Sequence, residues 1–131
     1  MIKRSNGFTV IEILFVAVLI GAASILFFIQ KQSLEVNARD DTRKIAINSM
    51  YYGLEEAFYP LNQYYPQTIN SDNLKSVDPT LFADPNGITI GTEGSEYTYS
   101  PINCADNKCE GYTLTTSLER EADFTKMSRN N

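Results

Sequence analysis

The sequence predicts an α+β protein in which a long N-terminal α-helix packs on a small antiparallel sheet. Three observations favour this fold class. Residues 8–29 form an apolar stretch, and residues 30–59 continue it with a one-sided apolar pattern that contains no proline. Residues 60–118 then alternate turn residues with short runs typical of strands. We expect a helix that is apolar all round in its first half and amphipathic in its second, below a head domain of antiparallel strands.

The composition disfavours several classes of function. The chain has 131 residues, which is enough for one small domain, and it contains no histidine, the commonest general base and metal ligand. Its two cysteines cannot fill a tetrahedral zinc site by themselves. The formal net charge of −5 is poorly suited to binding phosphate backbones. We therefore expect a protein that is not an enzyme, with no metal, no cofactor and no nucleic acid as a direct ligand.

The apolar stretch predicts a membrane-spanning helix. Residues 8–29 would form a helix roughly 33 Å long, which is enough to cross the hydrocarbon core of a bilayer. The short polar segment 1–7 before it carries Lys3 and Arg4. Because basic residues stay on the cytoplasmic side, we expect a cytoplasmic N-terminus and an exported remainder.

Two other interpretations of this stretch compete with a membrane span. One is a signal peptide cleaved near Ala22–Ser24, but the apolar run continues through Ile29, beyond such a cleavage point. The other is the buried helix of a soluble protein, but a domain of this size offers too little interior to cover a helix that is apolar on every side.

Glu12 is the only charged residue between Phe8 and Ile29. A carboxylate within a bilayer segment costs about 2.5–3.5 kcal/mol, and less near the interface. One interpretation is that Glu12 lies close enough to the headgroups to reach water. The other is that it meets a cation, which cleavage between Gly7 and Phe8 would create as a new α-amino group. That amine would lie one helical turn away in the same chain, or on a neighbouring chain in a bundle.

The segment Lys3–Ile13 resembles the N-terminal motif of type IV pilins and of the related secretion and competence pseudopilins. The shared features are basic residues, a glycine, and then the pattern Phe-Thr-Leu/Val-Ile-Glu. The resemblance implies that Gly7 ends a leader peptide of residues 1–7, and that a prepilin peptidase cuts after it and N-methylates Phe8. It also implies that Glu12 pairs with the Phe8 amine of an adjacent subunit and sets the register of assembly.

One feature departs from the family pattern. Many pilins carry a proline at the position of Ile29, beyond a glycine at the position of Gly21, and their helix loosens between the two. This chain keeps Gly21 and lacks the proline. Gly21 lowers local helix stability by about 1 kcal/mol relative to alanine, so it is interpreted either as a soft point or as a small residue packed between helices.

The amphipathic segment 30–59 is expected to end at Tyr59–Pro60, because proline disfavours helical backbone at the residue before it. The charged run 39–44 is interpreted as a solvated surface, with a contact between subunits as the alternative. Five residues form a single apolar stripe that should face the sheet: Ile47, Met50, Leu54, Ala57 and Phe58.

The head, residues 60–118, is expected to hold strands near 88–90, 97–99 and 112–118. Asp84–Gly87 should form a tight turn, which is preferred over a calcium-binding loop because there is no 12-residue ligand pattern. The polar tail 119–131 should fray. Cys104 and Cys109, in an exported head, should form a disulfide that pins the end of a hairpin.

The leading hypothesis from these features is a subunit of a type IV pilus. It would span the cytoplasmic membrane before assembly and then form a homo-oligomeric helical filament at the cell surface, with the help of a prepilin peptidase, an assembly platform and an external ATPase. Two alternatives stay open: a pseudopilin of a secretion or DNA-uptake system, and a membrane-anchored receptor head that never polymerises. An exported enzyme with a processed signal is disfavoured by the missing histidine.

Overall fold

A computed structural model describes residues 7–130 and divides the chain into two units, Met1–Glu35 and Val36–Asn131. One helical run extends from Val10 to Asn62 in three consecutive parts: the α-helix α1 (Val10–Tyr52), the π-helix η1 (Gly53–Phe58) and the short α-helix α2 (Tyr59–Asn62). The expected leader peptide, residues 1–7, falls outside the described residues except for Gly7.

The helix does not end at Tyr59–Pro60, as the sequence suggested, but at Asn62. In η1 the backbone widens, so that the N–H of Tyr59 bonds to the carbonyl of Leu54, five residues earlier. Pro60 then lies in the first turn of α2, where a missing N–H is tolerated. The run stops at Gln63, whose left-handed backbone (φ 61°) lets its N–H bond to the Tyr59 carbonyl.

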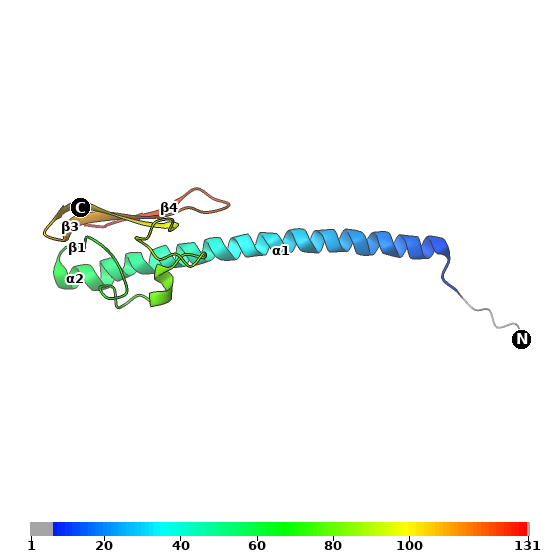
Figure 1. Cartoon of the computed structure of the whole chain (residues 1–131), viewed down its shortest axis with the longest axis horizontal. Coiled ribbons are helices and arrows are strands. Elements are labelled where there is room, and N and C mark those ends of the chain that lie inside the picture. The colour runs from blue at the N-terminus through cyan, green and yellow to red at the C-terminus, as the bar shows by residue number, and fades with distance from the viewer. Residues whose placement is uncertain (1–6, 131) are drawn as a thin grey trace, which may run out of the picture. The chain divides into compact units, whose positions relative to one another are not determined.

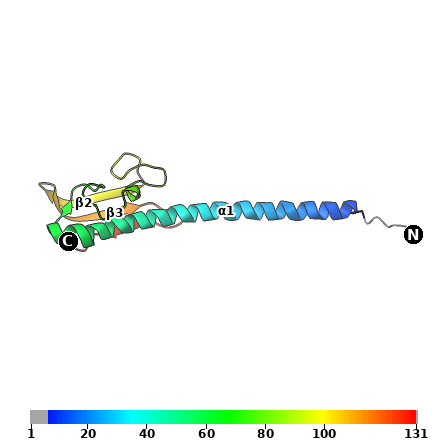
Figure 2. The ribbon, with the colours of Figure 1, turned by 90° about the horizontal axis from the view of Figure 1, so that it is seen from below.

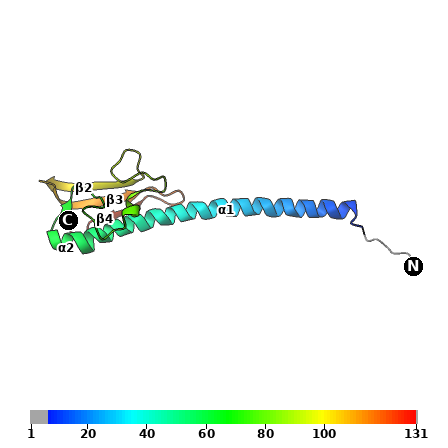
Figure 3. The same ribbon diagram turned by 60° about the horizontal axis from the view of Figure 1, so that its bottom comes forward.

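The second unit contains a four-stranded antiparallel sheet, which lies along one side of the C-terminal part of the helical run (Figure 1). Its strands are β1 (Tyr65–Pro66), β2 (Tyr97–Ala105), β3 (Lys108–Thr116) and β4 (Phe124–Met127). β2 and β3 pair along their whole length as a hairpin, which Figure 2 shows as two adjacent ribbons. β1 and β4 pair with opposite ends of the other edge of β3, and Figure 3 shows β2, β3 and β4 in this order.

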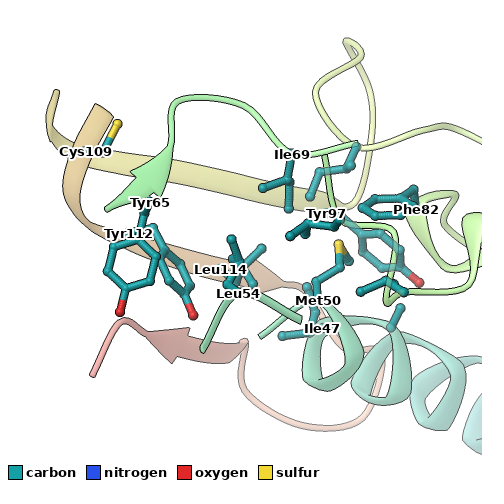
Figure 4. Close-up of a cluster of buried hydrophobic side chains, with 14 residues drawn as sticks. Ile47, Met50, Leu54, Tyr65, Ile69, Phe82, Tyr97, Cys109, Tyr112 and Leu114 are labelled. Carbon is teal, nitrogen blue, oxygen red and sulfur yellow. The ribbon is translucent and has the colours of Figure 1, made fainter. Parts of the chain in front are cut away.

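The core of the second unit lies between this helix and the sheet (Figure 4). Ile47, Met50 and Leu54 are fully buried and come from the apolar stripe that the sequence predicted, while Phe58 packs against the core and is partly buried. The sheet supplies the other half of the core through Tyr65, Tyr97, Tyr112 and Leu114, and the segments between β1 and β2 add Ile69, Leu74, Val77, Phe82 and Ile90. The predicted α+β arrangement is confirmed.

Two predictions about the head were wrong. Residues 88–90 form only a single bridge, Thr89 to Ala83, because Gly87 and Gly91 both have positive φ and turn the chain at either end. The tail does not fray: β4 pairs with residues 113–116 of β3, and Ser128 exchanges two hydrogen bonds with the backbone of Tyr112. The sequence pattern did not reveal this strand, because the residue that packs over the rings of Tyr51 and Phe124 is Lys126 and not an apolar residue.

A close contact explains the glycine in η1. A Cβ atom at Gly53 would lie 2.6 Å from Cγ2 of Val77, so the segment 70–77 can approach the helix only where a side chain is missing. We predict that Gly53→Ala destabilises the head, because an overpacking cost of about 1–3 kcal/mol outweighs a helix-propensity gain of about 1 kcal/mol. Denaturant unfolding of the full chain in detergent micelles measures this effect.

The matched variant for this test is Gly53→Ala combined with Val77→Ala, which removes the clashing methyl groups. Relative to Val77→Ala alone, adding Gly53→Ala should cost little. A higher unfolding midpoint for Gly53→Ala by itself would contradict the prediction.

Candidate functional site

The residues that the sequence singled out for processing and assembly lie at the start of α1. Gly7, Phe8 and Thr9 precede the helix and are exposed, with Phe8 77% exposed. Helical structure begins at Val10, so Glu12 occupies the third position of the first turn. A carboxylate is favoured there by the positive end of the helix dipole.

Glu12 forms a reciprocal cap with Thr9. The backbone N–H of Thr9 donates to Oε2 of Glu12 at 3.2 Å, and the backbone N–H of Glu12 donates to Oγ1 of Thr9 at 3.3 Å. This is a capping box, in which two N–H groups at the helix start are satisfied by side chains. The pattern Thr-x-x-Glu before an apolar run is a sequence signal for a capping box. The interpretation of Glu12 from its charge alone missed this signal.

The structure therefore places Glu12 next to Thr9. Both hydrogen bonds that the carboxylate accepts within residues 7–130 come from Thr9, and both end on Oε2. Oε1 of Glu12 accepts none in this part of the chain. One carboxylate oxygen is thus used to start the helix, and the other is open to a donor from outside residues 7–130.

The first part of α1 exposes an apolar surface. Fifteen large apolar residues between Phe8 and Ile29 are exposed, from 46% at Val16 to 81% at Val10. The helical run is long and apolar enough to cross a membrane, and its apolar part is not buried within the described residues. The hydroxyl of Ser24, the only polar side chain between Ile13 and Ile29, donates to the carbonyl of Ile20 at 2.8 Å and so needs no outside partner.

The two cysteines form the predicted disulfide, Cys104–Cys109. They face each other across the β2–β3 hairpin, one residue pair from its turn. The turn residues Asp106 and Asn107 both have positive φ, which matches the backbone of a two-residue hairpin turn. The bond therefore closes the end of a hairpin whose register is already set by its turn.

The charged run 39–44 is not a simple solvated surface. Arg43 is 3% exposed and its guanidinium bonds to Glu96, Asp40 and Glu119 at 2.8–3.0 Å. Asp40, also 3% exposed, accepts the backbone N–H groups of Glu119 and Arg120. These contacts attach the loop after β3 to the helix, and no pattern in the sequence showed that residues 96 and 119 come together here.

Hydrogen bonds to the charged forms lower the pKa values of three carboxyl groups in this part of the head. Arg39, and then Arg43, lower the pKa of Glu119 to about 2. The backbone N–H of Glu119 is the main cause that lowers the pKa of Asp40. Burial acts to raise the pKa of Asp84, but three backbone N–H groups, from Glu96, Ile88 and Asn86, prevail and lower it. Asp84 thus stabilises the tight turn expected from the sequence.

A second buried carboxylate contacts residues near the end of the described chain. Glu55 is 5% exposed and accepts the hydroxyls of Tyr65 and Tyr112 and the backbone N–H of Arg129 at 2.8–3.2 Å. Its neighbour Glu56 points outward and pairs with the Arg129 guanidinium at 2.6 Å. Tyr65 and Tyr112 thus form a hydrogen-bonded cluster around Glu55.

Comparisons of this chain with protein-family models, with curated proteins and with solved structures find no match.

The carboxyl groups around Arg43 predict that the head is sensitive to acid. Because the pKa of Glu119 is lowered from 4.5 to about 2 on folding, its contribution to stability is complete above pH 4.5 and is lost as the pH falls toward 2. We expect the unfolding midpoint in denaturant to fall over this range, and Glu119→Gln to make the fall less steep. Glu121→Gln, at a residue whose side chain is 61% exposed, is the control. An unchanged pH dependence in Glu119→Gln would contradict the prediction.

Proposed function

We propose that this chain is a structural subunit of a type IV pilus-like filament, which polymerises through its N-terminal helix. The observation that carries the proposal is Glu12: the only charge among residues 8–29 lies in the first turn of a helix whose apolar side chains are exposed. The resemblance of residues 3–13 to the prepilin motif supports the same assignment.

The exposed apolar surface supports two successive environments for the helix. Each large apolar side chain gains about 1.5–3 kcal/mol on leaving water, so residues 8–29 are expected either in lipid or among other helices. Before assembly the helix crosses the cytoplasmic membrane, with its N-terminus in the cytoplasm and the head outside. After assembly the same surface packs against neighbouring subunits in a filament at the cell surface.

Proteolysis supplies the cation in this proposal. A prepilin peptidase cuts between Gly7 and Phe8 and methylates the Phe8 amine, which is positive at neutral pH. In the filament this amine meets the open Oε1 of Glu12 on an adjacent subunit, while Oε2 keeps its bonds to Thr9. The free energy of an apolar bundle that contains an ion pair depends strongly on the axial position of its subunits, because a charge left there without its partner costs about 3–5 kcal/mol. Such a pair sets the axial register.

The capping box allows a test that separates the charge of Glu12 from its role in starting the helix. Glutamine also satisfies a capping box, so Glu12→Gln keeps the cap and removes the charge. Thr9→Val removes the hydroxyl of the cap and keeps the charge, at a cost to the helix of about 0.5–2 kcal/mol. We predict that Glu12→Gln and Glu12→Leu abolish filaments and that Thr9→Val still forms them, all with normal membrane insertion.

The measurement is electron microscopy and sedimentation of protein sheared from cells that express each variant, with the membrane fraction as the control for insertion. Normal filaments of Glu12→Gln together with failure of Thr9→Val would mean that Glu12 acts only as a helix cap. Short polymers confined to the cell envelope would assign the chain to the secretion or DNA-uptake machines instead of to a surface pilus.

A further inference from the structure

The tight turn Asp84–Gly87 contains a chemically reactive pair, Asn86 followed by Gly87. Because glycine has no side chain, its backbone nitrogen can reach the side-chain amide of a preceding asparagine, and the reaction converts that amide to a carboxylate. Both residues are exposed, and a Cβ atom at Gly87 would meet nothing within 4 Å apart from its chain neighbours. The chain's other Asn-Gly pair, Asn6–Gly7, belongs to the leader that the resemblance implies.

The reaction of this pair needs water as its only other reactant. The backbone nitrogen of Gly87 attacks Cγ of Asn86, the bond from Cγ to Nδ2 breaks, and Nδ2 leaves as ammonia with the proton that the nitrogen gives up. Water then opens the cyclic imide that has formed. Opening at Cγ yields aspartate, and opening at the backbone carbonyl carbon yields isoaspartate. Either product carries a carboxylate where the neutral amide was, and no atom is oxidised or reduced.

Hydrogen bonds to Asp84 hold the pair in a turn that opposes this attack. The N–H of Gly87 donates to the backbone carbonyl of Asp84 at 2.8 Å, so the attacking nitrogen is engaged while the turn is closed. Oδ1 of Asp84 accepts the N–H groups of Asn86 and Ile88, each at 2.9 Å. Oδ2 accepts the N–H of Glu96, also at 2.9 Å. The nitrogen is therefore free only when the turn opens, and the Asp84 carboxylate controls how often this happens.

The product would place a new negative charge beside an existing one. Nδ2 of Asn86 donates to Oε1 of Glu96 at 3.3 Å, and Glu96 bonds to Arg43 through both of its carboxylate oxygens. Arg43 already has Asp40 and Glu119 as further partners. A carboxylate at position 86 replaces a hydrogen-bond donor by a like charge, so it repels Glu96 and opposes the contact of Glu96 with Arg43.

We propose that Asn86 is a modification site, at which the chain deamidates spontaneously when the turn at Asp84 opens, and that the carboxylate formed there destabilises the ionic cluster around Arg43. The fraction of converted chains therefore rises with the age of the protein. The site uses neither Glu12 nor the exposed apolar surface of α1, so the proposal stands independently of the proposed filament.

The test follows deamidation by mass spectrometry in the full chain, held in detergent micelles at neutral pH. After reduction and tryptic digestion, Asn86 lies in the peptide 76–108 together with Asn103 and Asn107. Because these two precede residues that have side chains, they are internal controls. In urea we expect Asn86 to convert at least about tenfold faster than either control, and folding should slow it at least about tenfold while leaving it the fastest of the three.

Matched variants test the role of Asp84. Asp84→Asn should speed conversion of Asn86 in the folded chain at least about tenfold, whereas Asp78→Asn, at the chain's other Asp-Pro turn, should leave it unchanged. The dispersion of the amide spectrum shows whether each variant is folded. If Asp84→Asn does not fold, the comparison of the folded chain with the chain in urea tests the same step.

The effect of the product is tested with Asn86→Asp, which carries the new charge, and Asn86→Gln, which keeps the amide. We expect Asn86→Asp to unfold at a lower denaturant concentration than Asn86→Gln, and added salt should reduce the difference. The proposal is overturned if Asn86 converts no faster than Asn103 and Asn107, if neither folding nor Asp84→Asn changes its rate, or if Asn86→Asp is as stable as Asn86→Gln.

Discussion

The apolar surface that α1 exposes is the dominant physical constraint on this protein. The side chains between Phe8 and Ile29 are exposed among the described residues, and an apolar helical segment of this length is expected to have lipid or other helices around it. Apolar contact alone is weakly directional, so it does not fix how far one helix slides along another. The single carboxylate at Glu12 is the group in this segment that can supply such a register.

The capping box changes how Glu12 is understood. A carboxylate at the third position of a helix is fully explained by its bonds to the backbone and hydroxyl of Thr9. The proposed assembly role therefore depends on the second carboxylate oxygen and on the charge of Glu12. Cap and ion pair are compatible, since the cap orients the side chain at the helix start, close to where a processed terminus would lie.

Much of the fold was predictable because it depends on local periodicity. The apolar run over 8–29, the stripe through Ile47, Met50 and Leu54, and the two cysteines around a hairpin all follow from spacing along the chain. The close approach of Val77 to Gly53, at the start of the π-helix, was not predictable, because only folding brings these two residues together. β4 was missed because Lys126 covers aromatic rings where a strand pattern would place an apolar residue.

The head is fastened to the helix by polar groups as well as by its core. The clusters around Arg43 and Glu55 join positions 40–55 to positions 96–129. Because these pairs are far apart in the sequence, local sequence patterns do not predict them. The two clusters explain why a polar tail is ordered. At the candidate site, the motif singles out Gly7, Phe8 and Glu12, and the structure adds that Glu12 accepts two hydrogen bonds from Thr9.

Intact-mass and N-terminal analysis of protein sheared from the cell surface reports cleavage, methylation and location of the proposed filament subunit together. We expect a chain that begins at a methylated Phe8 and has lost the basic residues Lys3 and Arg4, which takes the formal net charge from −5 to −7. A surface protein that still carries residues 1–7, or a chain found only as a monomer in the membrane, would contradict it.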